Sequence, residues 1–273
     1  MLDDGPKVLL DAGDRLTLAT VAGKTFADLP ELLEAAAGSA GAIEPGDAVA
    51  DAPPPLCAVG RPGKVICIGL NYRLHAEESG APLPQYPMLF PKWATSLTDP
   101  GADIELPPES SFVDWESELT FVFGKRCRRV PQSGAADVVF GYTVANDVSM
   151  RDFQRHTTQF TAGKAWDLST PVGPAVVPVA DAGGIDPDLR ISGRLNEDTV
   201  QDSRTSDLIF GIPALVAYIT TVMTMQPGDI VLTGTPSGVG MAADPPRSLR
   251  DGDTYEVSVE GVGSIANRFV SPS

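Results

Sequence analysis

The chain has 273 residues and a formal net charge of −16, with 36 acidic and 20 basic side chains. Such an acidic surface repels the phosphates of nucleic acids, so we expect no nucleic-acid partner. Hydrophobic residues make up 42% of the chain, which is enough for a folded core. No apolar run approaches the roughly 18 residues that a membrane helix needs, so we expect no membrane contact.

The cysteines, Cys57, Cys67 and Cys127, are odd in number and show no CxxC spacing. A disulfide framework is therefore not expected, and reduced thiols are the simple interpretation. Together with the absence of a recognisable targeting segment, this predicts a cytoplasmic protein.

Residues 1–60 are predicted to form a small N-terminal domain and a linker. Lys7–Leu10 and Leu16–Val21 read as short strands, and Leu29–Ala37 reads as a helix. Consecutive prolines within Ala48–Leu56 favour an extended linker, because proline fits neither a helix interior nor a strand ladder.

Residues 61–273 are predicted to form a second, β-rich domain with few helices. The 27 glycines and 25 prolines of the chain fit many short strands and turns better than a helix bundle. Strands are predicted at Lys64–Ile68, Glu118–Phe123, Val138–Val144, Ala175–Pro178, Leu189–Leu195, Ile230–Thr233, Thr254–Val259 and Ser264–Phe269.

Two helices are predicted in the second domain. One is short and polar, from about residue 73 to 79, and is followed by a proline-rich loop, residues 80–91, that is a candidate lid. The other runs from about Ser206 to Met225, with an apolar stripe at helical spacing. Thr205 or Ser206 is expected to cap it, and Pro213 to kink or restart it.

Acidic side chains open one of the predicted strands. Asp114, Glu116 and Glu118 alternate, and alternate residues of a strand point to one face. Their mutual repulsion must be offset by solvent, by a cation or by a raised pKa, and this segment alone favours a solvated strand face.

A further acidic residue, Asp147, lies at the end of another predicted strand. Carboxylate oxygens suit a hard cation such as Mg²⁺ or Mn²⁺, and neither segment contains a histidine or cysteine that would favour zinc.

Five segments in chain order resemble the fumarylacetoacetate hydrolase superfamily. They span most of residues 61–240 and consist of 69–78 (GLNYRLHAEE), Glu116-x-Glu118, 141–152 (GYTVANDVSMRD), Gly163-Lys164 and 227–240 (PGDIVLTGTPSGVG). The resemblance implies an α+β, predominantly β fold of several packed sheets in residues 61–273, and a homodimer. It also implies that Glu116, Glu118 and Asp147 hold Mg²⁺ or Mn²⁺, with Asp114 behind them or at the surface.

The resemblance also indicates an acid–base pair. His75 and Glu78 are three residues apart on one helix, so the carboxylate can orient the imidazole, although such pairs also occur by chance on surface helices. In the family this pair activates a water. His156 has no evident partner and is interpreted as structural or exposed.

Basic and polar residues near the acidic segments are expected to bind the anionic substrate. The resemblance gives Lys164 a catalytic, charge-neutralising role and assigns substrate contacts to Arg151 and Gln154. Lys92 and Thr235 complete the predicted set of substrate-binding residues, with Thr235 as a hydrogen-bond donor to the substrate carboxylate.

The predicted function is Mg²⁺-dependent hydrolysis of a carbon–carbon bond in an acylpyruvate-type 2-oxo acid through a metal-stabilised enolate. The same enolate also serves a 2-hydroxyhepta-2,4-diene-1,7-dioate isomerase or tautomerase and an oxaloacetate decarboxylase, and the sequence does not choose between them. A non-catalytic metal- or ligand-binding protein is a further alternative, which the His75–Glu78 pair disfavours.

Three positions depart from the usual pattern of the family. Trp115 is unusually large, and the Asn196-Glu-Asp198 turn is expected to lengthen a hairpin. Trp166 is expected near the pocket, where it would narrow the range of substrates.

Overall fold

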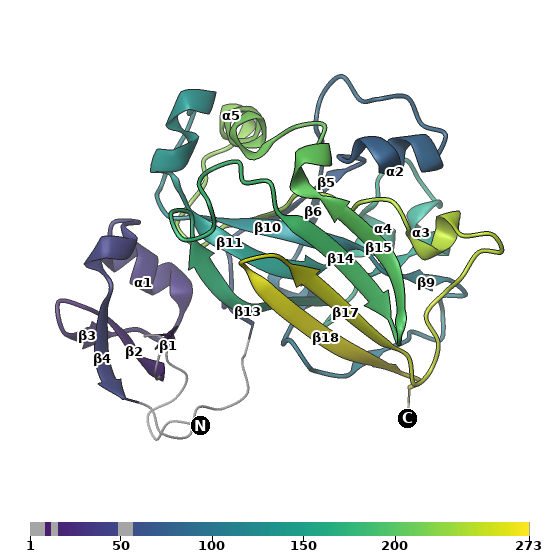
Figure 1. Cartoon of the computed structure of the whole chain (residues 1–273), viewed down its shortest axis with the longest axis horizontal. Coiled ribbons are helices and arrows are strands. Elements are labelled where there is room, and N and C mark those ends of the chain that lie inside the picture. Colours follow the sequence, from purple (N-terminus) through teal and green to yellow (C-terminus); the bar gives the residue numbers. More distant parts are fainter. Residues whose placement is uncertain (1–8, 12–15, 49–56, 273) are drawn as a thin grey trace.

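The computed structural model describes residues 9–11, 16–48 and 57–272, and consists mostly of strands in packed sheets with few helices (Figure 1). This confirms the predicted fold class. Most of the predicted linker, residues 49–56, and the start of the strand predicted at Lys7–Leu10 lie outside the described residues.

The N-terminal segment forms a small sheet with one helix. The sheet consists of β1 (Leu9–Asp11), β2 (Leu16–Val21), β3 (Lys24–Thr25) and β4 (Glu44–Ala48), and the helix is α1 (Leu29–Ala35). Asp28 caps α1, since its Oδ1 accepts the amide of Glu31 at 3.0 Å. Leu32 and Leu33 of α1 are buried in one cluster with residues of the larger sheet. The domain boundary near residue 60 stays a prediction.

A seven-stranded sheet forms the centre of the molecule, in the order β6-β5-β16-β10-β11-β13-β7. Its two middle strands, β10 and β11, are buried along their whole length, and the functional side chains described below lie at their ends. The strands are β5 (Val65–Gly69), β6 (Met88–Lys92), β7 (Leu97–Thr98), β10 (Ser117–Phe123), β11 (Val139–Asn146), β13 (Thr170–Pro178) and β16 (Ile230–Leu232).

A five-stranded sheet lies in front of the seven-stranded sheet in Figure 1, and one hydrophobic cluster joins the two. Its order is β15-β14-β17-β18-β8, and a separate pair, β9 with β12, lies beside it. The strands are β8 (Ile104–Glu105), β14 (Arg190–Leu195), β15 (Asp198–Arg204), β17 (Thr254–Val259), β18 (Gly263–Val270), β9 (Val113–Asp114) and β12 (Ser149–Met150).

The helices of this part are short and flank the sheets. They are α2 (Arg73–Glu78), α3 (Arg151–Gln154), α4 (Thr161–Lys164) and α5 (Ile212–Val222), with 3₁₀ turns at Ala94–Ser96, Gln132–Asp137, Thr205–Asp207 and Gly240–Ala242. A further 3₁₀ turn, Ala40–Ala42, lies in the N-terminal segment. None of the helices in the described ranges is long and apolar enough to cross a bilayer.

The helix predicted from Ser206 to Met225 begins later than expected. Residues Thr205–Asp207 form only a 3₁₀ turn, and α5 starts at Ile212 with Pro213 in its first turn. Proline disfavours helical geometry in the residue before it but suits the first helical turn, so Pro213 starts the helix. The amide of Ile212 is bound by Asp186 Oδ1 at 3.1 Å, and neither Thr205 nor Ser206 acts as the cap.

The proline-rich loop predicted at residues 80–91 is also shorter than expected. Met88–Lys92 forms strand β6, which pairs with β5 in a register that sets Pro91 opposite Ile66. Because β6 is the edge strand of its sheet, a proline there leaves no ladder bond unmade. The predicted lid therefore reduces to the connection between α2 and β6.

The turn at Asn196 is tight. Leu195 pairs with Asp198, so only two residues connect β14 to β15, and the prediction of a longer hairpin is wrong. Asn196 adopts a φ of 55°, which asparagine tolerates better than most residues.

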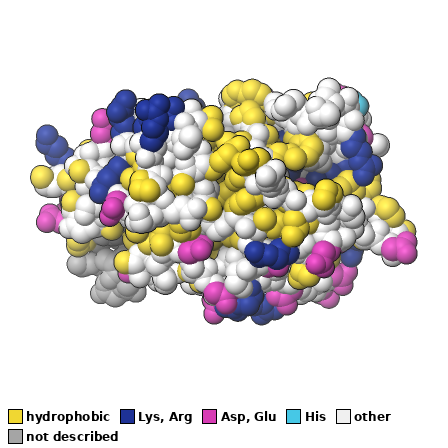
Figure 2. Space-filling model, turned by 90° about the horizontal axis from the view of Figure 1, so that it is seen from above, with side chains coloured by type: hydrophobic (Ala, Val, Ile, Leu, Met, Phe, Trp, Pro, Cys, Tyr) yellow, Lys and Arg dark blue, Asp and Glu magenta, His cyan; other side chains and the backbone are white. Residues whose placement is uncertain are grey.

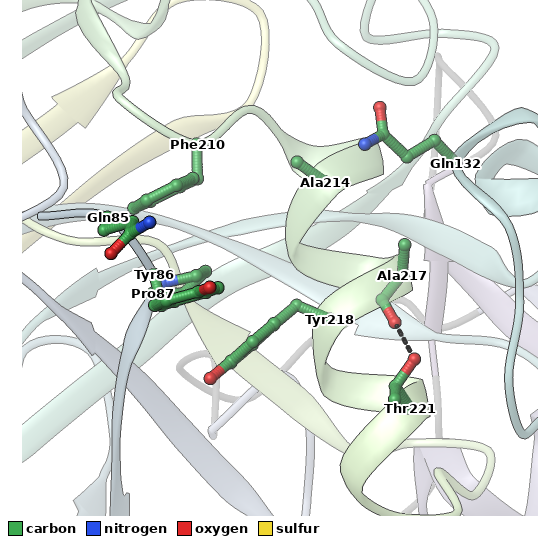
Figure 3. Close-up of a pocket in the computed structure, with 9 residues that line it drawn as sticks. All are labelled: Gln85, Tyr86, Pro87, Gln132, Phe210, Ala214, Ala217, Tyr218 and Thr221. Atoms are coloured by element: carbon green, nitrogen blue, oxygen red, sulfur yellow. Dashed lines mark hydrogen bonds between the residues drawn. The ribbon is translucent and has the colours of Figure 1, made fainter.

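A groove of about 360 Å³ follows the outer side of α5 (Figure 3). Tyr86 and Tyr218 face each other across it, with ring centroids 6.3 Å apart. This groove belongs to the face that carries α5 and α2, where hydrophobic side chains gather in the middle of the surface (Figure 2). None of the described residues that line it is a carboxylate, an amine or an imidazole.

We expect Gly193→Ala to destabilise the protein. A Cβ at Gly193 in β14 would lie 1.9 Å from Tyr255 Oη and 2.6 Å from Ser117 Oγ, so both side chains would have to move. Overpacking of this kind costs about 1–3 kcal/mol of unfolding free energy, measurable by urea denaturation. Gly41→Ala is the matched control, because its Cβ would meet only Ser39 Oγ at 3.8 Å. Equal losses of unfolding free energy in the two variants would contradict the close packing of Tyr255 and Ser117 against Gly193.

Candidate functional site

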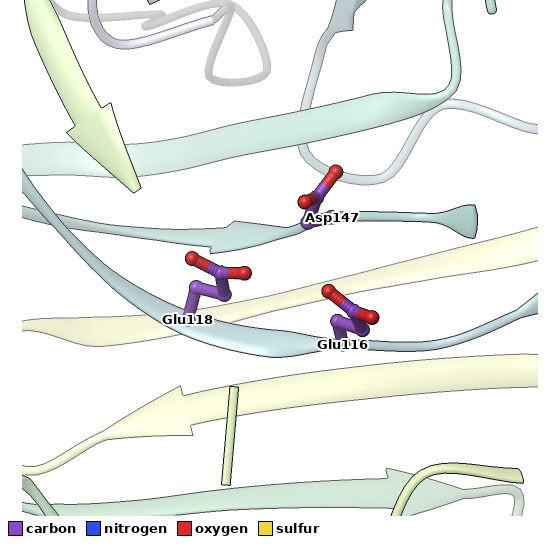
Figure 4. A group of neighbouring side chains, drawn as sticks. All are labelled: Glu116, Glu118 and Asp147. Carbon is purple, nitrogen blue, oxygen red and sulfur yellow. The ribbon is translucent and has the colours of Figure 1, made fainter. Parts of the chain in front are cut away.

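Three buried carboxylates converge at the centre of the seven-stranded sheet (Figure 4). Glu118 lies in β10, Glu116 directly precedes that strand, and Asp147 directly follows β11. The antiparallel register pairs Ser117 with Asn146, which sets the start of β10 against the end of β11. One oxygen of each carboxylate lies within 4.8 Å of the others, so the structure brings the predicted metal ligands together.

Two buried lysines offset part of this negative charge. Lys164 Nζ lies 2.5 Å from Glu116 Oε2 and 2.8 Å from Asp147 Oδ2, and Lys92 Nζ lies 2.6 Å from Asp147 Oδ1. Burial alone would lower the pKa of Lys164. The charges of Asp147 and Glu116 outweigh this effect and raise the pKa above its ordinary value, so the ammonium stays charged. Burial raises the pKa of Glu116, but Lys164 and Arg151 outweigh this and lower it to about 2.

Glu118 is the carboxylate of the cluster that neither lysine neutralises. Within the described ranges it has no lysine or arginine partner, and its Oε2 accepts only the amide of Gly234, at 2.6 Å. Burial, followed by the charges of Asp147 and Glu116, raises the pKa of Glu118 well above its ordinary value. A divalent cation between the three groups would remove this conflict, and an all-oxygen ligand set fits such an ion.

Asp114 does not share a face with the other acidic residues. The strand β9 ends at Asp114 and β10 begins only at Ser117, so the regular alternation predicted from the sequence is broken. Its buried carboxylate accepts the amides of Gly240 and Met241 at 2.7 and 3.0 Å, and binds Arg151 Nε at 2.8 Å. Asp114 therefore holds an arginine in place.

Arg151 is fixed between two carboxylates and one amide. Besides Asp114, its guanidinium contacts Glu116 Oε1 at 2.6 Å and Gln154 Oε1 at 3.0 Å. Its Nη2 is buried and has no partner within the described ranges. A buried donor without an acceptor costs free energy, which an acceptor on a bound ligand would relieve.

His75 and Glu78 form the predicted pair. Nδ1 of His75 lies 2.8 Å from Glu78 Oε1, and Glu78 Oε2 accepts the amide of Gly238 at 2.9 Å. A carboxylate only accepts, so Nδ1 donates in this bond, and in the neutral ring the lone pair is then on Nε2. No described residue hydrogen-bonds to Nε2, and His75 lines the same pocket as Glu116.

The base of α2 is fixed to the rest of the protein. Asn71 Nδ2 donates to Thr233 O at 2.8 Å, and its Oδ1 accepts the amide of Phe210 at 2.9 Å. Arg73 Nη1 donates to Leu208 O at 2.8 Å. These bonds hold His75 at a defined place beside the loop that contains Thr235.

A pocket of about 400 Å³ opens above the acidic cluster. The predicted site residues that line it are His75, Glu116, Arg151, Gln154, Lys164 and Thr235, and its apolar wall includes Met88, Phe90 and Phe160. Gly163 allows α3 and α4 to approach, since a Cβ there would lie 2.5 Å from Gln154 Cβ. The pocket therefore combines one base, several cationic groups and a carboxylate.

Other predicted residues lie outside the pocket lining. They are Glu78, Lys92, Glu118 and Asp147. The half-buried Trp166 also lies outside the lining and packs edge-on against Phe153, and its effect on the substrate range stays a prediction. Trp115 is buried and donates its indole N–H to Gly238 O at 3.0 Å, which supports the adjacent loop.

The sequence gives no definite role to two residues near the pocket. It offers no signal for Gln201, and it places Asp114 only behind the predicted ligands or at the surface. A lone glutamine in a polar strand gives no signal, whereas the Asp114–Arg151 pair spans 37 residues and depends on the tertiary fold. His156 is exposed, and its ring lies tilted against Phe153 with centroids 4.8 Å apart. Cys57, Cys67 and Cys127 are free thiols.

The chain matches relatives with closely similar sequences and structures. Residues 64–270 match the model of the fumarylacetoacetate (FAA) hydrolase C-terminal domain. The chain is 42% identical over 217 residues to the mitochondrial oxaloacetate tautomerase of Xenopus laevis, covering 79% of this chain and 68% of that protein.

Two solved structures extend this similarity. The 5-carboxymethyl-2-hydroxymuconate delta-isomerase of Mycobacterium smegmatis is 33% identical, with a TM-score of 0.74 over 98% of this chain and 94% of that chain. The fumarylpyruvate hydrolase of Pseudomonas aeruginosa, solved with Mn²⁺ and pyruvate, is 30% identical, with a TM-score of 0.69 over 77% and 90%. The chain is an enzyme and belongs to the fumarylacetoacetate hydrolase family.

Proposed function

We propose that this protein is a divalent-metal-dependent tautomerase that interconverts the enol and keto forms of a 2-oxo acid, with oxaloacetate as the leading substrate. The observation that carries this proposal is the position of His75. Its Nε2 is unbonded within the described residues, and the side chain lines the same pocket as Glu116, Lys164 and Arg151. The tautomerase and isomerase among the relatives of this chain favour tautomerisation over the carbon–carbon bond hydrolysis that was predicted first.

Glu116, Glu118 and Asp147 would hold Mg²⁺ or Mn²⁺. A bound divalent ion supplies Lewis acidity, which lowers the free energy of negative charge on the 2-oxo group of the substrate. The fit rests on the donor set itself, because three buried carboxylate oxygens lie within 4.8 Å and Glu118 lacks a cationic partner among the described residues.

The residues of the chain account for the proton transfer. His75 Nε2 takes a proton from the carbon next to the 2-oxo group, and the electron pair of that C–H bond becomes the C=C bond of the enolate. Lys164 and Arg151 stabilise the charge that develops on the oxygen. The enolate oxygen then takes a proton from solvent, and the reverse sequence restores the ketone. Glu78, held by the Gly238 amide, keeps Nδ1 protonated throughout.

Hydrolysis of an acylpyruvate is the second candidate function. It would use the same base, with His75 removing a proton from water instead of from carbon. The pyruvate in the fumarylpyruvate hydrolase neighbour favours this candidate. Oxaloacetate decarboxylation needs the same charge stabilisation without the base, so its rate should respond less to changes at His75.

We expect His75→Ala to lower the kcat for oxaloacetate tautomerisation by about 10²–10⁴-fold, because it removes the only base that we assign to the reaction. Glu78→Gln should lower kcat by a smaller factor, since it disturbs the orientation of the ring but keeps the imidazole. The decay of enol absorbance measures the rate, and the exposed His156→Ala is the control.

Pyruvate release from acylpyruvates and from oxaloacetate should be measured with the same enzyme. Full tautomerase activity in His75→Ala would contradict the assignment of the base. If the enzyme releases pyruvate from an acylpyruvate at a higher kcat/KM than it tautomerises oxaloacetate, the hydrolase is favoured.

We expect Mg²⁺ or Mn²⁺ to stabilise the EDTA-treated protein by about 2.7 kcal/mol at a hundredfold excess over Kd, seen as a rise in Tm. Glu118→Gln should abolish most of this rise because it removes a ligand. Glu109→Gln, at an exposed position, should keep it. Equal metal-induced shifts in the two variants would exclude Glu118 as a ligand.

The raised pKa of Glu118 gives these measurements a pH dependence. In metal-free protein the folded state holds this proton more tightly than the unfolded state, so stability falls as pH rises above about 4.5 through the raised pKa. Metal and proton compete for the same carboxylate, so the affinity for Mg²⁺ should increase over the same range. Titration calorimetry at several pH values measures it, and an affinity that decreases with pH would contradict the proposal.

A further inference from the structure

Gln201 of β15 is a buried polar residue that connects three parts of the site. Its Oε1 accepts the amide of Ser117 at 2.9 Å and the hydroxyl of Tyr255 at 2.8 Å. Its Nε2 donates to Thr235 Oγ1 at 2.9 Å and to Pro236 O at 2.8 Å. One carboxamide, only 1% exposed, thus joins the start of β10, strand β17 and the loop beside the pocket.

The orientation of this carboxamide is determined by its partners. The backbone amide of Ser117 can only donate, and the carbonyl of Pro236 can only accept. A flipped side chain would set donor against donor at Ser117 and acceptor against acceptor at Pro236. Nε2 of Gln201 therefore faces Thr235, and Thr235 Oγ1 is the acceptor in that bond.

The hydroxyl proton of Thr235 is consequently left for another acceptor. A hydroxyl has a single proton, and Gln201 uses a lone pair of Oγ1 instead of that proton. No described residue accepts from Thr235 Oγ1, and Thr235 lines the pocket together with His75, Glu116 and Lys164.

We propose that Gln201 is a positioning residue that keeps the Thr235 hydroxyl available as a hydrogen-bond donor to the carboxylate of the 2-oxo acid. This inference rests on the proposed function, because it takes the ligand of the pocket to be a carboxylate. Gln201 reaches the substrate only through Thr235. Since the same amide also binds Ser117, between Glu116 and Glu118, it fixes this donor relative to the acidic cluster.

The test uses the Mg²⁺-loaded full chain and oxalate, a small dicarboxylate that resembles the carboxylate and 2-oxo group of the substrate. Thr235→Val removes the donor at nearly constant volume. Gln201→Glu replaces the donor of the carboxamide by an acceptor, so the Thr235 hydroxyl turns toward the new carboxylate. A hydrogen bond to a charged group is then lost in either variant, and we expect the oxalate Kd from calorimetry to rise about 10- to 100-fold.

The double variant separates positioning from a general structural role. If Gln201 acts through Thr235, the Gln201→Glu/Thr235→Val double variant should bind oxalate no more weakly than Thr235→Val alone. Thr235→Ser keeps a hydroxyl and should bind within a few-fold of wild type. In the tautomerase assay, KM should rise in both single variants and kcat should change little.

Three results would overturn the inference. An unchanged oxalate Kd in Thr235→Val would do so even if the Gln201 variant failed to fold, and so would additive losses in the double variant. In these two cases oxalate binding by the wild type leaves the proposed function intact. Failure of the Mg²⁺-loaded wild type to bind oxalate would instead overturn the proposed function, and this inference with it.

Discussion

The repulsion among three buried carboxylates is the constraint on which the rest of the site depends. Glu116, Glu118 and Asp147 come from the ends of two paired central strands, and the register of that pairing brings them within 4.8 Å of one another. Lys92 and Lys164 satisfy Glu116 and Asp147 but leave Glu118 without a cationic partner within the described residues. Either a proton on Glu118 or a further cation relieves this repulsion, and we propose that a divalent ion does so when substrate binds. Such an ion would also stabilise negative charge on the substrate.

The surrounding structure supplies fixed geometry to this charged centre. The carboxylates of Asp114 and Glu116 and the amide of Gln154 immobilise Arg151. Glu78, itself bound by the Gly238 amide, orients His75. The loop after β16 contributes to both arrangements, because its amides bind Glu118, Glu78 and Asp114. A change in this loop would therefore affect the proposed metal ligand Glu118, the proposed base His75 and Arg151 together.

The sequence could predict most strands and the three carboxylates that the fold brings together, because hydrophobic alternation and ordered motifs are local signals. It gave no role to Arg155, which also lines the pocket. The sequence could not show where contacts between residues far apart in the chain override these local signals. Pro91 lies in a strand because β6 is an edge strand, and Asp114 leaves the acidic face because Gly240, Met241 and Arg151 bind it. The role of Gln201 depends on four partners from three segments, which no local pattern reveals. The roles of the site residues, the cytoplasmic location and the homodimer stay predictions.

Anomalous X-ray diffraction from crystals soaked with Mn²⁺ and oxalate tests the central claim most directly. The account predicts one strong anomalous peak about 2.0–2.3 Å from oxygens of Glu116, Glu118 and Asp147, with oxalate bound to the ion on the side of His75. An ion bound elsewhere in the pocket, or an empty cluster at saturating Mn²⁺ with Glu118 protonated, would contradict it.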